Sequence, residues 1–286
     1  MDGDQQTVSR GQEITPQEAA RLLDSLSEII ARASAATLAT AFADVERWIK
    51  PDQSPVTAAD EASEAIILDG VNRLLPGIPV VAEESVARLS AASLEPSFIS
   101  VDPLDGTKEF LAGRDEYTVN IAVVTHGVPI AGLITAPKKG LLWRGIIGIR
   151  AERLQLEIDG TKASVHTPSP IHARKAPKQL TVATSRSHLD KDSENFLARF
   201  SVGERFPCGS SVKFCFIAQG DVDIYPRLAP THEWDIAAGH AILTAAGGTV
   251  TAPDGGAIRF GQMEQKFLIP GFIAWGDPAL TAATKL

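Results

Sequence analysis

One acidic turn constrains this chain more than any other feature: the segment Asp102-Pro103-Leu104-Asp105-Gly106-Thr107. The proline fixes its own φ and keeps Asp102 extended, so the two carboxylates are directed toward one point. Gly106 allows the backbone to approach a ligand closely. Thr107 is expected to cap a short helix over 108–112, whose free N–H groups suit a phosphate. The fold must therefore present this turn at a ligand site.

Two short apolar runs end in acidic residues. The run 78–82 ends at Glu83-Glu84, and the run 98–101 ends at Asp102. Both runs are interpreted as strands, and the carboxyl ends of strands are a common place for ligands in layered folds of helices and sheets.

A fourth carboxylate belongs to the same pattern. Asp235 stands at the start of a predicted helix over 234–246. Carboxylate, carbonyl and water oxygens are the ligands that Mg²⁺ prefers, and four carboxylates at one place would repel each other without cations. Each acid alone is typical of a turn or a helix start, but together they predict a magnesium site made by Glu83, Asp102, Asp105 and Asp235.

The rest of the chain predicts alternating helices and strands. Helical spacing extends over 15–48 and 57–75, and β-rich runs occupy 117–125, 128–135 and 141–149. Strands and helices then alternate from 181 to 246, which predicts a parallel or mixed sheet flanked by helices. The stretch 161–179 is rich in Pro, Lys, Arg and His, and marks the expected boundary between subdomains 1–178 and 179–286.

Composition excludes several classes of protein. The 286 residues carry a formal net charge of −8, which argues against a nucleic-acid partner. No apolar run reaches the length of a membrane span, and the polar start has no signal-peptide pattern, so the cytoplasm is the expected location. The sequence does not indicate an oligomeric state.

Longer motifs resemble a known family. The segments DPLDGTKEF (102–110) and WDIAAGHAI (234–242), with the upstream acidic pair, are similar to the inositol monophosphatase superfamily of metal-dependent phosphatases. The segments SPVTAAD, CGSSVKFC, YPRL and FLIPGF resemble its bacterial 3'(2'),5'-bisphosphate nucleotidase branch more narrowly. The resemblance implies an α/β fold, a layered αβαβα sandwich of the sugar-phosphatase type.

The resemblance also implies roles for the acidic residues. Glu83, Asp102 and the Leu104 carbonyl would hold the first Mg²⁺, and Asp102, Asp105 and Asp235 the second, with a weaker third ion near Glu83. Thr107 and Asp60 would orient and deprotonate the attacking water, with Glu83 also assigned to catalysis. Inhibition by lithium is expected from the same likeness.

The implied substrate is a small nucleotide. The reaction would convert adenosine 3',5'-bisphosphate to AMP and phosphate in sulfur metabolism, with 3'-phosphoadenylyl sulfate as a second substrate. The expected substrate-binding set is Glu83, Leu104, Asp105, Gly106, Thr107, Ser210, Ser211, Lys213, Arg227 and Asp235. Peripheral membrane association is known of some relatives but has no signal here. Glu233, an added acid before Trp234, is expected to face solvent.

Three other functions remain open at this point. Inositol monophosphate or a sugar bisphosphate would use the same metal residues. A non-catalytic, metal-dependent binding module would also keep the carboxylates, although Thr107 and Asp60 speak for catalysis. An aspartyl-phosphate phosphatase needs Asp-x-Asp-Gly-Thr, whereas two residues separate Asp102 from Asp105 here, so its nucleophile and acid would be out of register.

Overall fold

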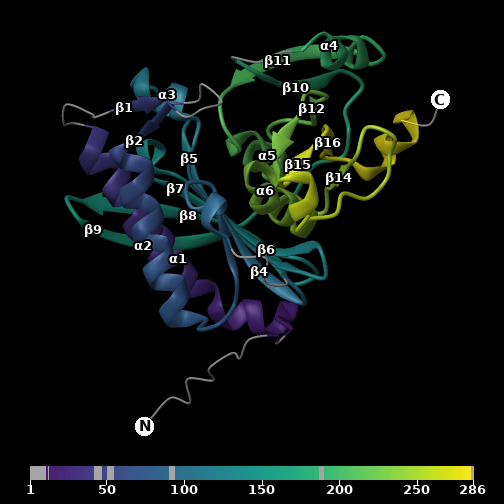
Figure 1. The fold of residues 1–286 in the computed structure, drawn as a ribbon. Coiled ribbons are helices and arrows are strands. Elements are labelled where there is room, and N and C mark those ends of the chain that lie inside the picture. The colour runs from purple at the N-terminus through teal and green to yellow at the C-terminus, as the bar shows by residue number, and fades with distance from the viewer. Residues whose placement is uncertain are drawn as a thin grey trace.

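The structure is a computed structural model that describes residues 11, 13–41, 47–49, 55–89, 94–186 and 190–284. These residues form five stacked layers: a helix pair, a seven-stranded sheet, a second helix pair, a five-stranded sheet and one outer helix (Figure 1). The layered αβαβα sandwich predicted from the sequence is confirmed.

The seven-stranded sheet carries the acidic turn. Its strands follow the order β3-β4-β5-β6-β7-β8-β9, and only β3 and β4 run parallel. The bounds are β3 Val80–Ala82, β4 Ser97–Asp105, β5 Thr118–Thr125, β6 Val128–Ala136, β7 Leu141–Ile146, β8 Arg150–Asp159 and β9 Lys162–Pro170. The predicted strands at 117–149 are therefore confirmed as an antiparallel meander.

Both faces of this sheet are buried. Alternate residues of a strand point to opposite faces, and in β5 Val119, Ile121 and Val123 pack with the first helix pair. The intervening Ala122 and Val124 pack with the second pair. The sequence of β5 is therefore continuously apolar, interrupted within the strand only by Asn120, whose side chain faces the second pair.

The first helix pair consists of α1 (Pro16–Ala41) and α2 (Ala58–Leu74). Each begins with a capping exchange, because Thr15 and Glu18 bond reciprocally, as do Thr57 and Asp60. The prediction that the first helix extends to Trp48 is wrong. Residues 47–49 form β1 (Arg47–Ile49), which pairs with β2 (Pro55–Thr57), and aromatic and β-branched residues such as Trp48 and Ile49 favour that state.

The second sheet is mixed, as predicted. Its order is β11-β10-β12-β16-β14, with parallel pairs around β10 and antiparallel pairs around β16. The bounds are β10 Leu180–Ser185, β11 Val202–Cys208, β12 Ile224–Arg227, β14 Thr249–Thr251 and β16 Phe272–Trp275. Two further strands, β13 (Thr231–His232) and β15 (Leu268–Ile269), pair separately.

Helices α5 (Val212–Ala218) and α6 (Glu233–Ala245) lie between the sheets, and α4 (Lys191–Leu197) covers the outer face. Close packing of α6 on β6 requires Gly132, because a Cβ there would lie 2.2 Å from the Ala238 carbonyl oxygen. Helix α6, although late in sequence, therefore joins the first sheet to the second.

The expected boundary stretch 161–179 is partly regular. Residues Lys162–Pro170 form the edge strand β9, so the lysine, histidine and prolines in this part of the stretch reflect an exposed sheet edge. The division into subdomains 1–178 and 179–286 stays a prediction. None of the helices in the described ranges is long and apolar enough to cross a bilayer.

Candidate active site

The acidic turn closes the end of β4. The Leu104 N–H donates to Asp102 Oδ1 at 3.0 Å, and Ser63 Oγ of α2 donates to the Pro103 carbonyl at 2.7 Å. Gly106 has φ +89° and precedes helix α3 (Thr107–Leu111). The predicted capping role of Thr107 is therefore wrong, because Gly106 occupies the cap position and Thr107 is the first helical residue.

Asp102 is the electrostatic centre of the site. Its side chain is 1% exposed, and its Oδ2 has no hydrogen-bond partner among the described residues. Burial raises the pKa of Asp102 well above its usual value, and the nearby charges of Glu83, Asp105 and Asp235 raise it further. The four predicted metal carboxylates therefore act on one another, although they come from three separate parts of the chain.

Asp105 lies where the two halves of the chain meet. Its Oδ2 accepts a hydrogen bond from the Ser211 N–H at the start of α5. Burial raises the pKa of Asp105 to about 6 and Asp235 adds to the rise, while the cations of Lys213 and Arg227 oppose it. Across the space between the sheets, Asp105 thus faces the carboxylate of Asp235 and the cations of Lys213 and Arg227.

Glu83 and Asp235 complete the acidic set from opposite sides. Glu83 follows β3, and its N–H donates to the Val101 carbonyl at 3.3 Å, so the parallel strands β3 and β4 end together. Asp235 occupies the first turn of α6, and its Oδ2 accepts from Thr231 Oγ1 and from the His232 N–H.

Glu64 is a carboxylate that the sequence reasoning missed. It is 5% exposed and accepts a hydrogen bond from the Glu84 N–H at 2.9 Å. It therefore supports the turn that carries Glu83. Its position in α2, four residues after Asp60, is the only signal that pointed to it.

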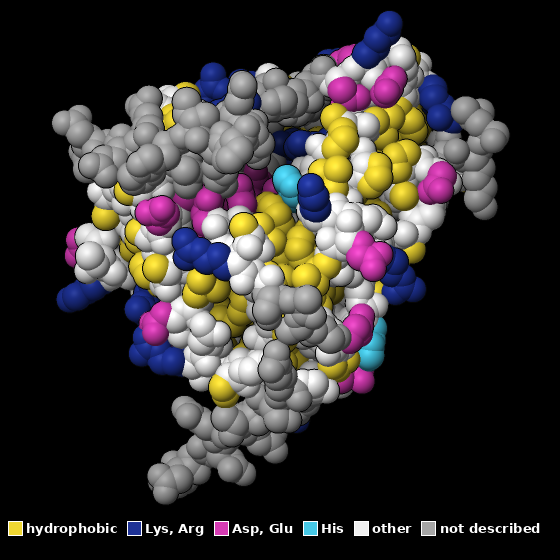
Figure 2. All heavy atoms as spheres, in the orientation of Figure 1, with side chains coloured by type: hydrophobic (Ala, Val, Ile, Leu, Met, Phe, Trp, Pro, Cys, Tyr) yellow, Lys and Arg dark blue, Asp and Glu magenta, His cyan; other side chains and the backbone are white. Residues whose placement is uncertain are grey.

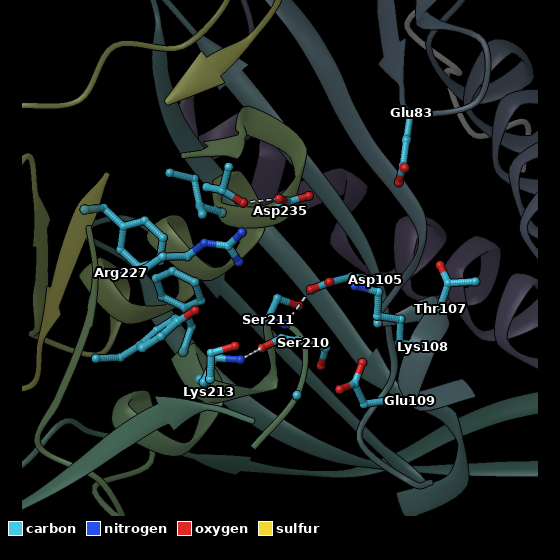
Figure 3. A pocket seen from close by; sticks show the side chains of 18 residues that line it. Glu83, Asp105, Thr107, Lys108, Glu109, Ser210, Ser211, Lys213, Arg227 and Asp235 are labelled. Carbon is cyan, nitrogen blue, oxygen red and sulfur yellow. Dashed lines mark hydrogen bonds between the residues drawn. The ribbon is translucent and has the colours of Figure 1, made fainter. Parts of the chain in front are cut away.

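Most of the predicted site residues surround a cavity of about 260 Å³ (Figure 3). Figure 2 shows acidic side chains gathered in a hollow on this face, with basic side chains close by. Nine of the predicted residues line the cavity: Glu83, Asp105, Gly106, Thr107, Ser210, Ser211, Lys213, Arg227 and Asp235. Asp60, Asp102 and Leu104 do not line it. The cavity is also lined by residues for which no role was predicted, among them Lys108, Glu109, Ser185, Tyr225 and Phe272.

The carboxylates do not stand in a closed cage. In the described part of the chain, no three His, Cys, Asp or Glu side chains are arranged to enclose a metal ion as they lie. Like charges separate when nothing neutralises them, and Asp105 and Asp235 instead accept hydrogen bonds from nearby donors. The all-oxygen donor set and the unpartnered Asp102 Oδ2 nevertheless fit a hard cation.

Thr107 and Asp60 meet as expected. Thr107 Oγ1 lies 3.5 Å from Asp60 Oδ1 and 3.4 Å from the Leu104 carbonyl oxygen. Asp60 Oδ2 accepts from both the N–H and the hydroxyl of Thr57, at 2.8 and 2.6 Å. One oxygen of Asp60 therefore caps α2, while the other faces Thr107.

The loop before α5 is held from both halves of the chain. Glu116 accepts a hydrogen bond from the Gly209 N–H at 2.9 Å and forms an ion pair with Arg186. Ser210, with φ +47°, donates its hydroxyl to the Glu116 carbonyl. Lys213 is 3% exposed and donates Nζ to the carbonyls of Ser210 and Cys208.

Arg227 extends from β12 toward the cavity. Its Nη2 donates to the Pro230 carbonyl at 3.2 Å, whereas its Nε is buried with no hydrogen-bond partner in the described ranges. Although burial opposes the charge, Tyr225, Asp235 and Asp105 together raise the pKa of Arg227. The guanidinium is thus a charged donor group directed at the acidic side of the cavity (Figure 3).

The expectation that Glu233 faces solvent is wrong. Glu233 is 1% exposed, and its two carboxylate oxygens accept hydrogen bonds from the N–H groups of Gly261 and Gln262. It therefore anchors the segment after β14 and does not line the cavity.

Comparisons with known proteins match nearly the whole chain. A model of the inositol monophosphatase family matches residues 17–283. The 3'(2'),5'-bisphosphate nucleotidase CysQ of Escherichia coli strain K12 is 38% identical over 231 residues, which cover 78% of this chain and 86% of that protein. The CysQ of Buchnera aphidicola is 38% identical over 226 residues, covering 79% of this chain and 82% of that protein.

Solved structures show the same fold. The crystal structure of CysQ from Bacteroides thetaiotaomicron has a TM-score of 0.74 and 32% identity, and the match covers 90% of this chain and 97% of that one. An inositol monophosphatase from Anabaena has a TM-score of 0.72 and 25% identity, covering 93% and 94% of the two chains.

Proposed function

This chain belongs to the inositol monophosphatase family, and on that premise we propose that it is a 3'(2'),5'-bisphosphate nucleotidase. It hydrolyses the 3'-phosphate of adenosine 3',5'-bisphosphate to give AMP and phosphate, and it accepts 3'-phosphoadenylyl sulfate as well. The 38% identity to the CysQ nucleotidases supports this choice of substrate over inositol or sugar phosphates. A cytoplasmic location stays a prediction.

The observation that carries the reaction type is the charge arrangement around Asp102. A buried carboxylate with an unpartnered oxygen, close to three further acids, stays ionised only when cations neutralise the charge, because without them its raised pKa favours a bound proton. We assign Glu83, Asp102 and the Leu104 carbonyl to one Mg²⁺, and Asp102, Asp105 and Asp235 to a second; a third ion would lie near Glu83. When bound, Mg²⁺ neutralises phosphate charge and makes water more acidic.

The chain's own residues supply the proton path. Thr107 Oγ1 can accept a hydrogen bond from the attacking water and pass its own proton toward Asp60 Oδ1, 3.5 Å away. The two hydrogen bonds from Thr57 keep Asp60 in place as the acceptor. Glu83, at the neighbouring end of β3, would hold the Mg²⁺ that makes this water acidic.

The second phosphate needs a separate cation. Arg227 is a charged, partly unpartnered guanidinium on the cavity wall, and a guanidinium binds phosphate with two donors. We assign the 5'-phosphate to Arg227. Ser210, Ser211 and Lys213 shape the adjoining wall, and the backbone of Gly106 and Thr107 faces the phosphate that is cleaved.

Phosphate release from four compounds tests the substrate. The purified enzyme with Mg²⁺ should act on adenosine 3',5'-bisphosphate and 3'-phosphoadenylyl sulfate far better than on inositol 1-phosphate or fructose 1,6-bisphosphate. Absence of activity on the first compound would defeat the substrate assignment. Binding of all four without turnover would instead favour a non-catalytic module.

A single variant tests the role of Arg227. Arg227→Met should raise KM for adenosine 3',5'-bisphosphate at least about tenfold, in line with loss of a charged hydrogen bond. It should change KM for 3'-AMP, which lacks the 5'-phosphate, much less. Equal effects on both substrates would remove Arg227 from the 5'-phosphate site.

A further inference from the structure

Asn120 is a buried polar side chain that the proposed reaction does not use. It lies in the middle of β5, is 1% exposed, and stands directly opposite Asp102 of β4 in the strand register. Directly opposed residues of an antiparallel pair point to the same face, with Cβ atoms about 4.5–5.5 Å apart. Asn120 therefore borders the same inter-sheet space as Asp102.

One side of the Asn120 amide holds the start of α5. Ser211 Oγ donates to Asn120 Oδ1 at 2.8 Å and lies 2.8 Å from Thr118 Oγ1. The main-chain N–H of the same Ser211 donates to Asp105. Asn120 thus fixes the residue that holds Asp105, across more than ninety positions of sequence.

The other side of the amide has no hydrogen-bond partner. Asn120 Nδ2 and Asp102 Oδ2 are both buried, and neither finds a partner among the residues the structure describes. A buried polar group without a hydrogen-bond partner destabilises the folded chain. The two unpartnered atoms are a donor and an acceptor, and they belong to side chains that face each other across β4 and β5.

We propose that Asn120 is a positioning residue for the metal-binding carboxylates: a rotation of either side chain joins Nδ2 to Asp102 Oδ2, two atoms that are not hydrogen-bonded to each other in this structure, while Asn120 keeps the hydrogen bond from Ser211. The proposal rests on the proposed metal site. Asp102 and Asp105 are then joined by one chain of hydrogen bonds through Asn120 and Ser211. A carboxylate oxygen has two lone pairs, so Asp102 Oδ2 keeps one for a cation.

The surroundings of Asn120 favour this role over simple packing. On the same face of the sheet, its neighbours Ala122 on β5 and Ile134, directly opposite on β6, are buried and apolar. An apolar side chain would fill such a position without an unsatisfied amide. Groups that orient metal ligands in this way typically contribute 10- to 100-fold to metal affinity.

Metal binding without substrate tests the proposal directly. Asn120→Leu keeps the volume and the branching of the side chain but removes both hydrogen-bonding groups. Titration of Mn²⁺ into the protein, followed by electron paramagnetic resonance, should show affinity weakened by about tenfold or more. In the assay, excess Mg²⁺ should restore kcat, and KM for the nucleotide at saturating Mg²⁺ should stay near the wild-type value.

Ser100→Ala is the matched control. Ser100 lies two positions before Asp102 in β4 and also has a buried oxygen without a partner in the described chain. Its removal should leave Mn²⁺ affinity unchanged. A purely structural role of Asn120 would lower the melting temperature of the metal-free variant but would not change the Mn²⁺ affinity of its folded form.

The outcomes separate the two proposals. Wild-type protein that binds no Mn²⁺ would defeat the proposed metal site itself. Wild-type binding with equal affinity in folded Asn120→Leu would overturn the role of Asn120. If that variant does not fold, Ser211→Ala carries the test, because it breaks the same chain of hydrogen bonds; unchanged Mn²⁺ affinity there would also overturn the proposal.

Discussion

Thr107 Oγ1 lies 3.5 Å from Asp60 Oδ1, although 47 positions of sequence separate the two residues. The contact joins the first turn of α2 to the first residue of α3. Because Asp60 also caps α2 through Thr57, one carboxylate serves both the fold and the proposed proton path.

Because of this double role, substitutions of Thr107 and of Asp60 should affect activity and stability differently. Thr107→Val removes the hydroxyl and keeps the branched shape, so kcat should fall about 100-fold or more while the melting temperature stays close to wild type. Steady-state assays and thermal melts check both expectations. A variant that keeps more than about a tenth of kcat would exclude Thr107 from the proton path.

Asp60→Asn should affect activity and stability together. It removes the proton acceptor and also weakens the capping exchange with Thr57, for which a loss of about 1 kcal/mol in the free energy of unfolding is expected. Urea unfolding measures the second effect. Stability equal to wild type, with activity lost, would mean that the asparagine side chain caps α2 as well as the carboxylate does.

The stability of the metal-free protein should depend on pH through Asp105. Its pKa is raised from 3.8 to about 6, so the folded protein binds this proton more tightly than the unfolded chain does. The contribution to stability is complete below pH 4 and is lost as the pH rises through about 6. With EDTA present, the melting temperature should therefore fall between pH 5 and pH 7.5.

Mg²⁺ should reverse that fall. Since protons compete with the cation for the same carboxylates, added Mg²⁺ should raise the melting temperature strongly at pH 7.5 and little at pH 5. Asp105→Asn is the control, because it removes one of the two carboxylates whose pKa is raised and should make the EDTA profile less steep, leaving the part that belongs to Asp102. A Mg²⁺ response that is the same at both pH values would contradict the metal assignment.

Li⁺ should inhibit turnover at millimolar concentration, as expected from the family.

The loop at Gly209 tolerates no side chain. A Cβ there would lie 2.5 Å from Glu109 Cγ and 2.8 Å from its Cδ, so Gly209→Ala must displace either Glu109 or the loop that presents Ser211 to Asp105. We expect a loss of about 1–3 kcal/mol in stability and a fall in kcat/KM. Gly256→Ala, where the nearest atoms belong to the side chain of Asp254, should change neither measurement.

Local signals in the sequence predicted the alternating helices and strands and pointed to the acidic residues proposed to hold the metals, whereas the five-layer arrangement was implied by the resemblance to the family. Apolar runs that end in Glu83 and Asp102, and helix starts at Thr15 and Thr57, are visible in single segments. The orientation of Lys213 could not be predicted, because its Nζ donates to carbonyls of a loop whose path depends on Glu116, which lies in the segment between α3 and β5. Contacts between the two halves cannot be read from either half alone.

Glu233 is a second residue whose contacts could not be predicted from its own segment of the sequence. Its neighbours in sequence, His232 and Trp234, gave no sign that the N–H groups of Gly261 and Gln262 would cover its carboxylate. Glu233→Ala would leave both buried donors without this acceptor, which should reduce the free energy of unfolding by about 2–6 kcal/mol, from about 1–3 kcal/mol for each donor.

The loss of stability in Glu233→Ala should not be accompanied by a loss of kcat. Glu233 does not line the cavity, so kcat per folded molecule should stay near wild type at a temperature well below the melting transition. Glu264→Ala, an exposed acid in the same covering segment, should change neither stability nor kcat. Loss of kcat with unchanged stability in Glu233→Ala would instead place Glu233 among the residues that set the charge of the metal site, because only its proximity to Asp235 could then explain the result.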